Sequence, residues 1–437
     1  MMRKDLIIAG GIVVDPAGGI EGMRDVLVRD GRIAAVERRI LVRRAKKGRK
    51  PDFEAVDARG CWVVPGLIDL HVHLRQPGQS PDETIATGTR AAARGGITSL
   101  VTMPNTRPVV DTPARLKSLL ARIKKEAVVN VLVAAAVTVS QKGRRTTDFD
   151  ALAKSGACAF SDDGLPVVDP NLMRAALNAS KRLGLPVLDH AETPHLTGCG
   201  VVHDGPFAKR RKLPGIPSRS ETLMAMRDIA LAHQTGGHLH ICHASCAGTV
   251  DMIRRAKRAG VRVSAEAAPH HFTLTDSDID PKNASYKMKP PLREGRDREA
   301  IIRGLSDGTI DAIATDHAPH RASRKKLGIL KAPFGMTGLE TALPLSLALL
   351  DRRALDPRRL VERMSTAPAR LLGLKSKGHL RRGADADITI IDPKAEETYT
   401  STVSRSRNTP FWGRRLRGLA RATIVGGKVV YLRESGK

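Results

Sequence analysis

Aromatic residues and long apolar runs are scarce in this chain of 437 residues. Phe, Trp and Tyr make up 3 % of the sequence, which leaves few rings on which the bases of single-stranded nucleic acid can stack. No stretch approaches the roughly 18 consecutive apolar residues of a membrane-spanning helix. The sequence therefore predicts no membrane span and argues against binding of single-stranded nucleic acid.

Cysteines are also few, and they lack the spacing of a disulfide framework. The five are Cys61, Cys158, Cys199, Cys242 and Cys246. The last two lie in Cys-His-Ala-Ser-Cys, where three intervening residues and the lack of a second pair argue against a zinc knuckle. An odd number of unpatterned cysteines is typical of a reduced compartment, so we expect a cytoplasmic protein.

Acidic residues are outnumbered by basic ones, 45 to 73, which gives a formal net charge of +28. Such an excess is common in nucleic-acid-binding proteins, but here the basic residues are spread along the whole chain. One dense cluster, at residues 42–50, is expected to be a loop inserted between strands. We interpret the charge as a solvated basic surface, with steering of a small polyanionic substrate as the functional alternative.

Both ends of the chain have the sequence pattern of β-strands. Residues 1–16 superficially resemble a signal peptide, because a basic head precedes a short apolar run. Asp5 interrupts that head, and Gly-Gly at 10–11 and Asp-Pro at 15–16 are turn signals, so we interpret the segment as a strand pair. Near the C-terminus, Gly-Gly within residues 423–432 separates two β-branched runs, which predicts a hairpin.

Between the ends, short apolar runs alternate with helical patterns, which is typical of βα units and a parallel sheet. The eight candidate strands are residues 66–72, 97–103, 128–137, 157–161, 186–190, 238–243, 261–267 and 310–316. This pattern predicts an α/β fold, a (β/α)8 TIM barrel over residues 66–374. Residues 1–65 and 375–437 are expected to form one small β-sandwich domain beside it.

Potential metal ligands stand where the predicted strands end, which is where barrel enzymes keep their sites. His71 and His73 end the first strand, and residues two apart on a strand face the same way. Asp162 and Asp163 follow the fourth strand. The fifth, sixth and eighth strands end at His190, His243 and Asp316.

Each of these signals is weak alone, because a single histidine at a strand end is commonly a hydrogen-bonded structural residue. Four imidazoles with carboxylates at separate strand ends form a set that suits zinc or a similar divalent ion. We therefore predict a metal site at the barrel mouth. The remaining histidines of these motifs are interpreted as core or supporting residues: His240, His270, His271 and His317.

A series of short motifs carries a family resemblance over nearly the whole chain. In order they are PGLIDLHVHLRQPG, VTMPNT, AFSDDG, LDHAE, ICHAS, APHH, KPPLR, ATDHAPH and KAPFG. The series resembles the bacterial long-chain, class I type dihydroorotases of the amidohydrolase superfamily. The motif series is very specific for the superfamily and somewhat less specific for the long-chain dihydroorotases.

The resemblance implies two divalent metal ions, with zinc expected. It assigns one ion to the histidines of the first strand and the other to those of the fifth and sixth: His71, His73, His190 and His243. Asp163, 27 residues before His190, takes the place of the carboxylate that bridges both ions, and Asp162 then orients the turn. Hydantoinases and allantoinases use a carbamylated lysine as the bridge, which Ser-Asp-Asp-Gly does not offer.

The resemblance makes Asp316 a ligand of the first ion and the catalytic proton shuttle. Metal ions lower the pKa of a bridging water, so that hydroxide exists near neutral pH. The hydroxide attacks the ring amide carbonyl of dihydroorotate, and Asp316 passes the proton to the leaving nitrogen. The reverse reaction cyclises N-carbamoyl-L-aspartate to L-dihydroorotate, the direction of de novo pyrimidine biosynthesis.

The free carboxylate of this substrate requires cations and donors beyond the metal ions. Arg75 can present a planar guanidinium to it, whereas the alternative is a surface ion pair. Asn105 and His320 match the other substrate contacts of the family, although a turn-stabilising role is the alternative for Asn105. Phe334 and Gly335 match the loop whose backbone meets the ring.

One position departs from the family pattern. Asn-Pro-Pro normally precedes Leu-Arg, and that Asn touches the substrate, whereas here Lys289 stands in its place. Lysine has no acceptor and adds a positive charge, so recognition of the ring edge must differ. We expect Lys289 to act as a cation on the substrate side, the alternative being an ammonium group that turns to solvent.

Two other functions of this fold stay as alternatives, and a third alternative is nucleic-acid binding through the basic surface. One is a related cyclic amidase that acts on hydantoin or a dihydropyrimidine. The other is a metal-free barrel that serves as a subunit of aspartate transcarbamoylase, although the complete ligand set argues against it. We expect a homo-oligomer, and nucleic acid is not the expected partner.

Overall fold

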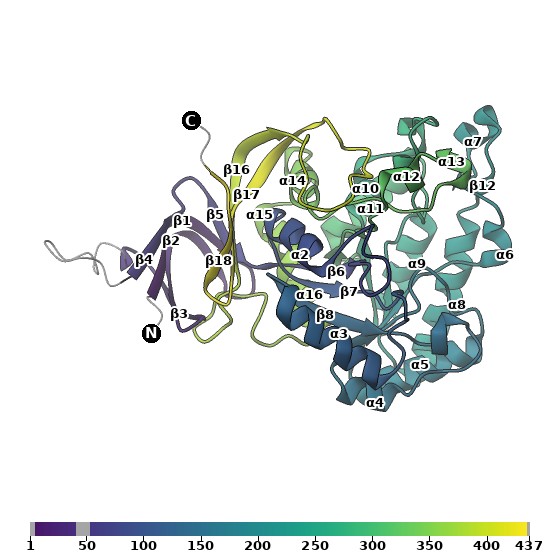
Figure 1. The fold of residues 1–437 in the computed structure, drawn as a ribbon, viewed down its shortest axis with the longest axis horizontal. Helices are drawn as coiled ribbons and strands as arrows, with labels where there is room; N and C mark the ends of the chain where they lie inside the picture. Colours follow the sequence, from purple (N-terminus) through teal and green to yellow (C-terminus); the bar gives the residue numbers. More distant parts are fainter. Residues whose placement is uncertain (1–4, 41–52, 435–437) are drawn as a thin grey trace, which may run out of the picture.

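A barrel built from the middle of the chain lies beside a sheet built from both of its ends (Figure 1). The structure is a computed structural model that describes residues 5–40 and 53–434. The basic cluster that we expected to form a loop, residues 42–50, lies outside the described residues. Within them, no helix has the length and apolar character that crossing a bilayer requires.

Eight parallel strands form the barrel, each paired with the next along the chain. They are β6 (Leu67–Val72), β7 (Ile97–Thr102), β8 (Asn130–Ala135), β9 (Ala157–Phe160), β10 (Val187–Asp189), β13 (Leu239–Ile241), β14 (Val263–Ala267) and β15 (Ala312–Ile313). All eight predicted strands are confirmed. The expected fold class, a (β/α)8 barrel with a β-domain from the two termini, is therefore correct.

Helices surround the barrel, and their ends follow the expected signals. In α5 (Pro170–Leu183), Asp169 caps the first turn, proline occupies the first turn, and Gly184 ends the helix in a left-handed conformation. The other longer helices are α2 (Ile85–Arg94), α3 (Pro113–Glu126), α8 (Arg219–Thr235), α9 (Ala247–Arg258), α11 (Gly295–Asp307) and α14 (Ala342–Asp351). Shorter ones are α4 (Phe149–Lys154), α6 (Pro194–Thr197), α7 (Pro206–Arg211), α10 (Pro269–Thr273), α12 (Ala322–Lys325), α13 (Gly328–Lys331), α15 (Pro357–Val361) and α16 (Ala367–Leu371).

A buried carboxylate joins the first barrel strand to the segment after the last one. Asp69 accepts hydrogen bonds from the backbone N–H of His71 (3.1 Å) and from Thr315, through its N–H (3.0 Å) and its hydroxyl (2.6 Å). Val72 pairs with His317 immediately beyond. Burial raises the pKa of Asp69 to about 6. These contacts fix the end of β6 that carries His71 and His73 against the segment that carries Asp316.

The terminal sheet takes five strands from the N-terminal side and three from the C-terminal side. They are β1 (Asp5–Asp15), β2 (Ile20–Arg29), β3 (Arg32–Glu37), β4 (Phe53–Asp57), β5 (Trp62–Pro65), β16 (Ile388–Thr398), β17 (Arg415–Val425) and β18 (Lys428–Leu432). β16 joins the two halves by pairing antiparallel with β5. Apolar side chains of both halves share one buried cluster. The predicted hairpin at residues 423–432 is confirmed, because β17 pairs with β18 across Gly-Gly.

The expectation of a turn at Gly-Gly in residues 10–11 was wrong. β1 runs through both glycines, and its pairing with β2 shifts register between Ile8 and Gly11. Before the shift β1 also pairs with β4, and after it with β5. The two glycines therefore make a bulge at which β1 changes partner, whereas the turn lies after Asp15, as the Asp-Pro signal predicted.

We expect Gly11→Ala to lower the free energy of unfolding by about 1–3 kcal/mol, the usual cost of overpacking. An added Cβ would lie 2.4 Å from Cγ2 of Val63 and 3.0 Å from Cβ of Ala58. The control is Gly295→Ala at the start of α11, where no atom lies within 4 Å of the added Cβ. Denaturant unfolding of both variants checks this, and equal stabilities would contradict it.

Candidate active site

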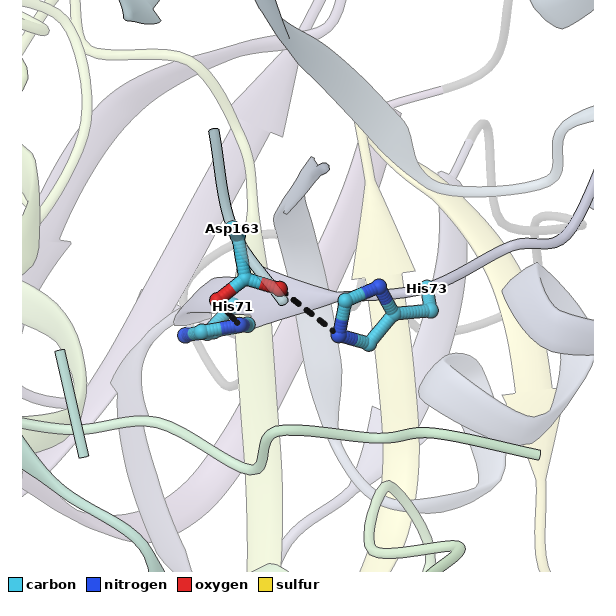
Figure 2. Close-up of side chains that lie close together, drawn as sticks. All are labelled: His71, His73 and Asp163. Carbon is cyan, nitrogen blue, oxygen red and sulfur yellow. Dashed lines mark ion pairs between the residues drawn. The ribbon is translucent and has the colours of Figure 1, made fainter. Parts of the chain in front are cut away.

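Six side chains converge where the barrel strands end: His71, His73, Asp163, His190, His243 and Asp316. All six are buried. Asp163 lies among them, with its Oδ1 3.1 Å from Nε2 of His71 and its Oδ2 3.4 Å from Nε2 of His73 (Figure 2). The structure thus brings together every residue that the sequence nominated as a metal ligand.

The other two histidines approach Asp163 from β10 and β13. Its Oδ1 lies 3.7 Å from Nδ1 of His190 and 3.8 Å from Nε2 of His243. Those two nitrogens lie 2.9 Å from each other. One carboxylate therefore faces two pairs of imidazoles, the arrangement that a carboxylate shared by two cations requires.

The neighbouring acid, Asp162, turns away from this cluster. Its Oδ1 accepts the backbone N–H groups of Val137 (2.9 Å) and Thr138 (3.0 Å), and its Oδ2 accepts the hydroxyl of Thr138. Asp162 thereby ties the turn after β9 to the segment after β8. This contact leaves Asp163 as the acid of the pair that faces the histidines.

Acceptors lie behind three of the imidazoles, on the side away from Asp163. His71 donates from Nδ1 to Glu266 (2.8 Å), and His73 donates from Nδ1 to Oδ1 of Asn105 (3.0 Å). On the other side, Nε2 of His190 lies 3.4 Å from Glu192. With an acceptor for its outer N–H, each of these imidazoles can give up its inner proton and offer a lone pair to a cation beside Asp163. This orientation is typical of metal-binding histidines.

The donor set fits divalent cations. Two groups of ligand atoms, each within 4.8 Å of one another, share Asp163: His71, His73 and Asp163, and Asp163, His190 and His243. Among the described residues, Nε2 of His71 and Oδ1 of Asp163 are buried without a hydrogen-bond partner. Burial alone would raise the pKa of Asp163, but the imidazoles of His71, His190 and His243 hold it well below its ordinary value. An ionised, buried carboxylate of this kind calls for positive charge.

A third group of potential ligand atoms consists of His71, Cys242 and Glu266. Burial holds the pKa of the Cys242 thiol well above its ordinary value, whereas a metal ligand must be a thiolate. Glu266 is already bonded to His71 and, through Oε2, to Nε2 of His240 (3.1 Å). This group is therefore suited to orient His71 by hydrogen bonding and not to bind a metal ion.

Asp316 lies on the side of the first histidine pair. Its Oδ1 is 3.1 Å from Nε2 of His73 and 3.6 Å from Nε2 of His71. Burial would raise the pKa of Asp316, but the imidazoles of His73, His71 and His243 lower it far below its ordinary value. Like His243 and Arg75, it has a positive φ, an uncommon backbone conformation for a residue other than glycine. The side chain is thus an ionised acceptor held in a strained loop.

A cavity of about 220 Å³ opens above the cluster. The residues nominated for substrate binding all line it: Arg75, Asn105, Lys289, His320, Phe334 and Gly335. Arg75 is buried and donates from Nε to the carbonyl of Pro319 (3.2 Å), so it is no surface ion pair. Asn105 contacts His73 and also donates to the carbonyl of Asp163 (3.3 Å).

His320 and the loop at residues 334–335 form one side of the cavity. His320 donates from Nε2 to the carbonyl of Phe334 (2.8 Å). Burial and the guanidinium of Arg75 lower the pKa of His320 to about 2, so the imidazole is neutral. Gly335 has φ +117°, and an added Cβ would lie 2.6 Å from Cβ of Ala318. Only glycine therefore allows the loop to lie this close to the barrel.

Lys289 faces the cavity but already has a partner. Its Nζ donates to Oε1 of Glu192 (3.0 Å) and lies 5.0 Å from the centre of the Phe334 ring. Burial would raise the pKa of Glu192, but His190 and Lys289 lower it to about 2. A chain of contacts thus runs from Lys289 through Glu192 to the metal-ligand candidate His190.

Sequence reasoning missed several residues that support the site, among them Glu266, Glu192 and Asn408. Glu266 is a single acid inside the buried strand β14, and an acid in such a strand is a signal that could have been followed. Glu192, two residues after His190, offers a weaker signal of the same kind. Asn408 gives none, because it stands far from every motif.

Asn408 belongs to the segment between β16 and β17, which reaches from the terminal sheet towards α10 and α12 (Figure 1). Its side chain accepts the N–H of His320 (2.9 Å) and donates to the carbonyls of Ala318 and Gly335 (both 3.1 Å). Its own carbonyl accepts the N–H of Thr337 (2.9 Å). Asn408 therefore clamps the two loops that carry His320 and Gly335.

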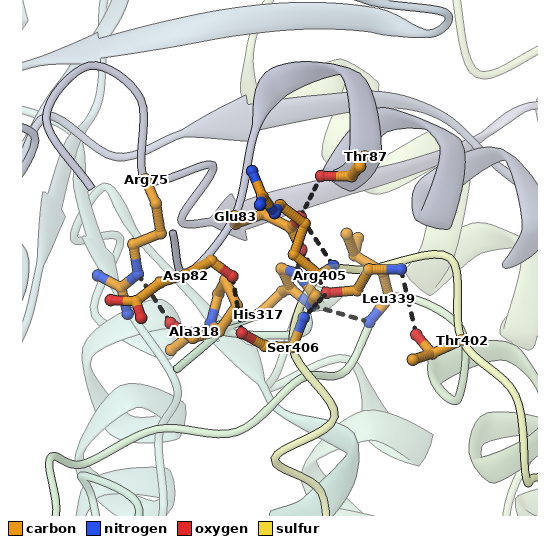
Figure 3. Close-up of polar contacts among 12 residues, drawn as sticks. Arg75, Asp82, Glu83, Thr87, His317, Ala318, Leu339, Thr402, Arg405 and Ser406 are labelled. Carbon is orange, nitrogen blue, oxygen red and sulfur yellow. Dashed lines mark hydrogen bonds and ion pairs between the residues drawn. The ribbon is translucent and has the colours of Figure 1, made fainter. Parts of the chain in front are cut away.

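The same segment meets Glu83, a fully buried acid ahead of α2 (Figure 3). Glu83 accepts hydrogen bonds from the hydroxyls of Thr87 and Ser404 and from the N–H of Arg405 (3.2 Å). It also lies 3.3 Å from Nε2 of His317. The histidine next to Asp316 thus depends on residues contributed by the C-terminal part of the chain.

Comparisons with known proteins agree with this geometry. Residues 60–248 match the family model described as dihydro-orotase-like, and residues 216–431 match that of the amidohydrolase family. A dihydroorotase of Anaeromyxobacter sp. (strain K) is 48 % identical over 100 % of this chain and 99 % of its own length. One of Pelotomaculum thermopropionicum is 49 % identical, covering 97 % and 98 % of the two chains.

Solved structures match the fold. The L-hydantoinase (dihydropyrimidinase) of Arthrobacter aurescens superposes with a TM-score of 0.86 at 24 % identity, over 99 % of this chain and 97 % of that one. The dihydropyrimidinase of Brevibacillus agri NCHU1002 gives a TM-score of 0.85 at 24 % identity, over 98 % and 95 % of the two chains. At this identity the likeness shows a shared fold.

We expect Asp163→Ala to lose more bound metal than Asp162→Ala, because only Asp163 faces both histidine pairs. The unsubstituted protein should hold one to two equivalents of a zinc-like metal. Asp162→Ala should keep that content but melt at a lower temperature, because two N–H groups lose their acceptor. Elemental analysis with thermal unfolding checks this, and the opposite ranking of metal content would mean that Asp162 is the ligand.

Proposed function

This chain belongs to the dihydroorotase family, and from that premise we propose that it cyclises N-carbamoyl-L-aspartate reversibly to L-dihydroorotate. The observation that carries the proposal is Asp163, a carboxylate 3.1–3.8 Å from a nitrogen of each of four histidines. Arg75, buried in the same cavity, supports a substrate with a free carboxylate. In this role the enzyme would serve de novo pyrimidine biosynthesis.

The metal requirement follows from the donor set, and we propose two zinc ions. His71 and His73 would hold one, His190 and His243 the other, and Asp163 both. When bound, such ions lower the pKa of a water molecule and polarise the amide carbonyl. Asp316 would complete the first site, because its carboxylate already lies beside His73 and His71.

Asp316 would also move the proton. In ring opening, a carboxylate oxygen of Asp316 takes the proton of the attacking water and delivers it to the ring nitrogen as the C–N bond breaks. In ring closure, the terminal carbamoyl nitrogen attacks the side-chain carboxyl carbon and gives its proton to Asp316. Asp316 passes that proton to the departing carboxyl oxygen, which takes a second proton from solvent and leaves as water. The ionised state of Asp316 in this site suits the accepting step.

The remaining cavity residues would orient the substrate. Arg75 would hold the free carboxylate, and the neutral His320 would meet the ring as a hydrogen-bonding partner without charge. Asn105, fixed between His73 and the carbonyl of Asp163, would contribute its amide edge. The backbone at Phe334 and Gly335 would contact the ring from the facing loop.

The competing activity is opening of hydantoin or a dihydropyrimidine, which stays an alternative because Lys289 stands where the family has a substrate-contacting asparagine. Assays of carbamoyl aspartate cyclisation, dihydroorotate opening and hydantoin opening on the metal-loaded protein distinguish the two. We expect the first two activities and little of the third. Hydantoin opening without any dihydroorotate activity would reject the proposal.

We further propose that the enzyme works in the cytoplasm as a homo-oligomer. The five cysteines are all free, which supports a reduced compartment. Leu223 and Met226 of α8 and the neighbouring Leu165 and Val168 are exposed apolar side chains, which supports an association. Aspartate transcarbamoylase is the heteromeric alternative, and size-exclusion chromatography with and without it separates the two.

We expect Asp316→Asn to reduce kcat by a factor of about 100 or more, the scale of general acid–base catalysis, while metal stays substantially bound. An amide oxygen can still coordinate a cation but cannot accept the proton. Steady-state kinetics with metal analysis of the same sample checks this. Near-normal turnover would remove Asp316 from the proton-transfer step.

Lys289→Ala should raise KM for carbamoyl aspartate about tenfold, the scale of one charge-assisted hydrogen bond, with metal content unchanged. Lys289→Asn should recover part of the loss, because its amide can still donate to Glu192. The control is Lys287→Ala, since Lys287 lies 4.6 Å from the same Phe334 ring but donates to the carbonyl of Leu330. An unchanged KM in Lys289→Ala would show that the ammonium group serves only Glu192.

A further inference from the structure

A second cavity, of about 470 Å³, adjoins the reaction cavity. Arg75, Asn105 and His320 line both of them, so these three side chains form a common wall. The second cavity is otherwise lined by the loop before α2, by Arg107, and by Arg321 and Arg324 around α12. We call it the arginine vestibule.

The vestibule carries an excess of positive charge. Four arginines line it, Arg75, Arg107, Arg321 and Arg324, against one carboxylate, Asp82. Asp82 is nearly buried and pairs with Nη1 of Arg324 at 3.1 Å and more loosely with Nε of Arg321 at 3.9 Å. The formal balance of these side chains is therefore +3.

Two of the arginines have no carboxylate of their own within the described residues. Arg75 donates to the carbonyl of Pro319, and its Nη2 lies 3.4 Å from Nε2 of the neutral His320. Arg107 is exposed, and its side chain makes no hydrogen bond or ion pair with a described residue. A guanidinium group presents several donors in one plane, which match a carboxylate or a phosphate. Two such groups therefore remain available to an anion.

Neighbouring groups respond to the positive field. Burial, together with the charges of Lys287, Arg324 and Arg75, lowers the pKa of Lys325 to about 7. The low pKa of His320 has burial and Arg75 as its first two causes. Both shifts have the sign expected next to uncompensated cations.

We propose that the arginine vestibule is a second anion-binding site that captures the dianionic open-chain substrate before it reaches the metal centre. The inference rests on the proposed function and deepens it. Carbamoyl aspartate carries two carboxylates, and cyclisation consumes one, so dihydroorotate carries a single negative charge. One carboxylate of the open chain meets Arg75 while the other meets Arg107. Dihydroorotate has a single carboxylate and cannot pair with both arginines, so the vestibule favours the substrate of cyclisation over its product.

The test uses Arg107→Gln, because the Arg107 side chain has no partner in the described fold that its loss would disrupt. The matched control is Arg303→Gln, an exposed arginine on α11 outside the vestibule, which changes the net charge by the same amount. We expect kcat/KM for carbamoyl aspartate to fall about tenfold in Arg107→Gln and to stay unchanged in the control. For dihydroorotate the fall should be less than about threefold, because attraction to a cation scales with charge. Added salt should reduce the difference between Arg107→Gln and the unsubstituted enzyme.

A binding measurement separates this proposal from the proposed function. Calorimetric titration of the metal-loaded protein with succinate, a dianion without an amide, should show affinity about tenfold weaker in Arg107→Gln than in Arg303→Gln. Butyrate, of equal chain length but one charge, should bind weakly to both. Equal succinate affinities in the two variants would reject the proposal that the vestibule binds anions, even if the enzyme is active. If only Arg107→Gln loses succinate affinity and the protein has no dihydroorotate activity, the anion site in the vestibule is supported. That result would reject only the proposed dihydroorotase function.

Discussion

Closure of the barrel between β6 and the segment after β15 is the contact on which the site depends. Asp69 holds Thr315 from 246 positions away in sequence, and the N–H of His73 donates to the carbonyl of His317 (2.9 Å). These bonds bring His73 to Asp316. The carboxylate of Asp69 accepts three hydrogen bonds in the closed barrel, which offset the cost of burying it. Without this closure Asp316 and the first histidine pair would not lie together.

A second constraint is the concentration of buried charge at Asp163. Burying a carboxylate is costly unless cations or donors surround it, and here four imidazoles do so. When an imidazole binds a metal ion, it gives up its inner proton and presents a lone pair, and an acceptor behind it then holds the outer N–H. Glu266, Asn105 and Glu192 supply three such acceptors. The candidate ligands and the acceptors behind them are therefore one structure, and a change in either is expected to alter metal affinity.

The sequence predicted the strands and the ligands because both follow from local patterns. His71 and His73 share a face through the two-residue period of a strand, and ligands at strand ends meet at one mouth of a barrel. The bulge at Gly11 was missed because Gly-Gly is a signal for both turns and bulges, and only the pairing of β1 with β4 and β5 decides between them. The bond between His71 and Glu266 spans 195 positions, so no local pattern shows it.

The part of the site that was hardest to predict comes from the segment between β16 and β17. Its composition resembles a connection between two strands of the terminal sheet, yet Ser404 bonds to Glu83, and Asn408 holds the loops of His320 and Gly335. Glu83 in turn contacts His317, whose carbonyl accepts the N–H of His73. A chain of polar contacts thus links the segment to a metal-ligand candidate. Because these contacts are buried, displacing the segment would leave charged and polar groups unpaired at the barrel mouth. The strands contributed by the two termini therefore do more than complete a separate sheet, since they anchor the segment that holds the loops of His320 and Gly335 at the cavity.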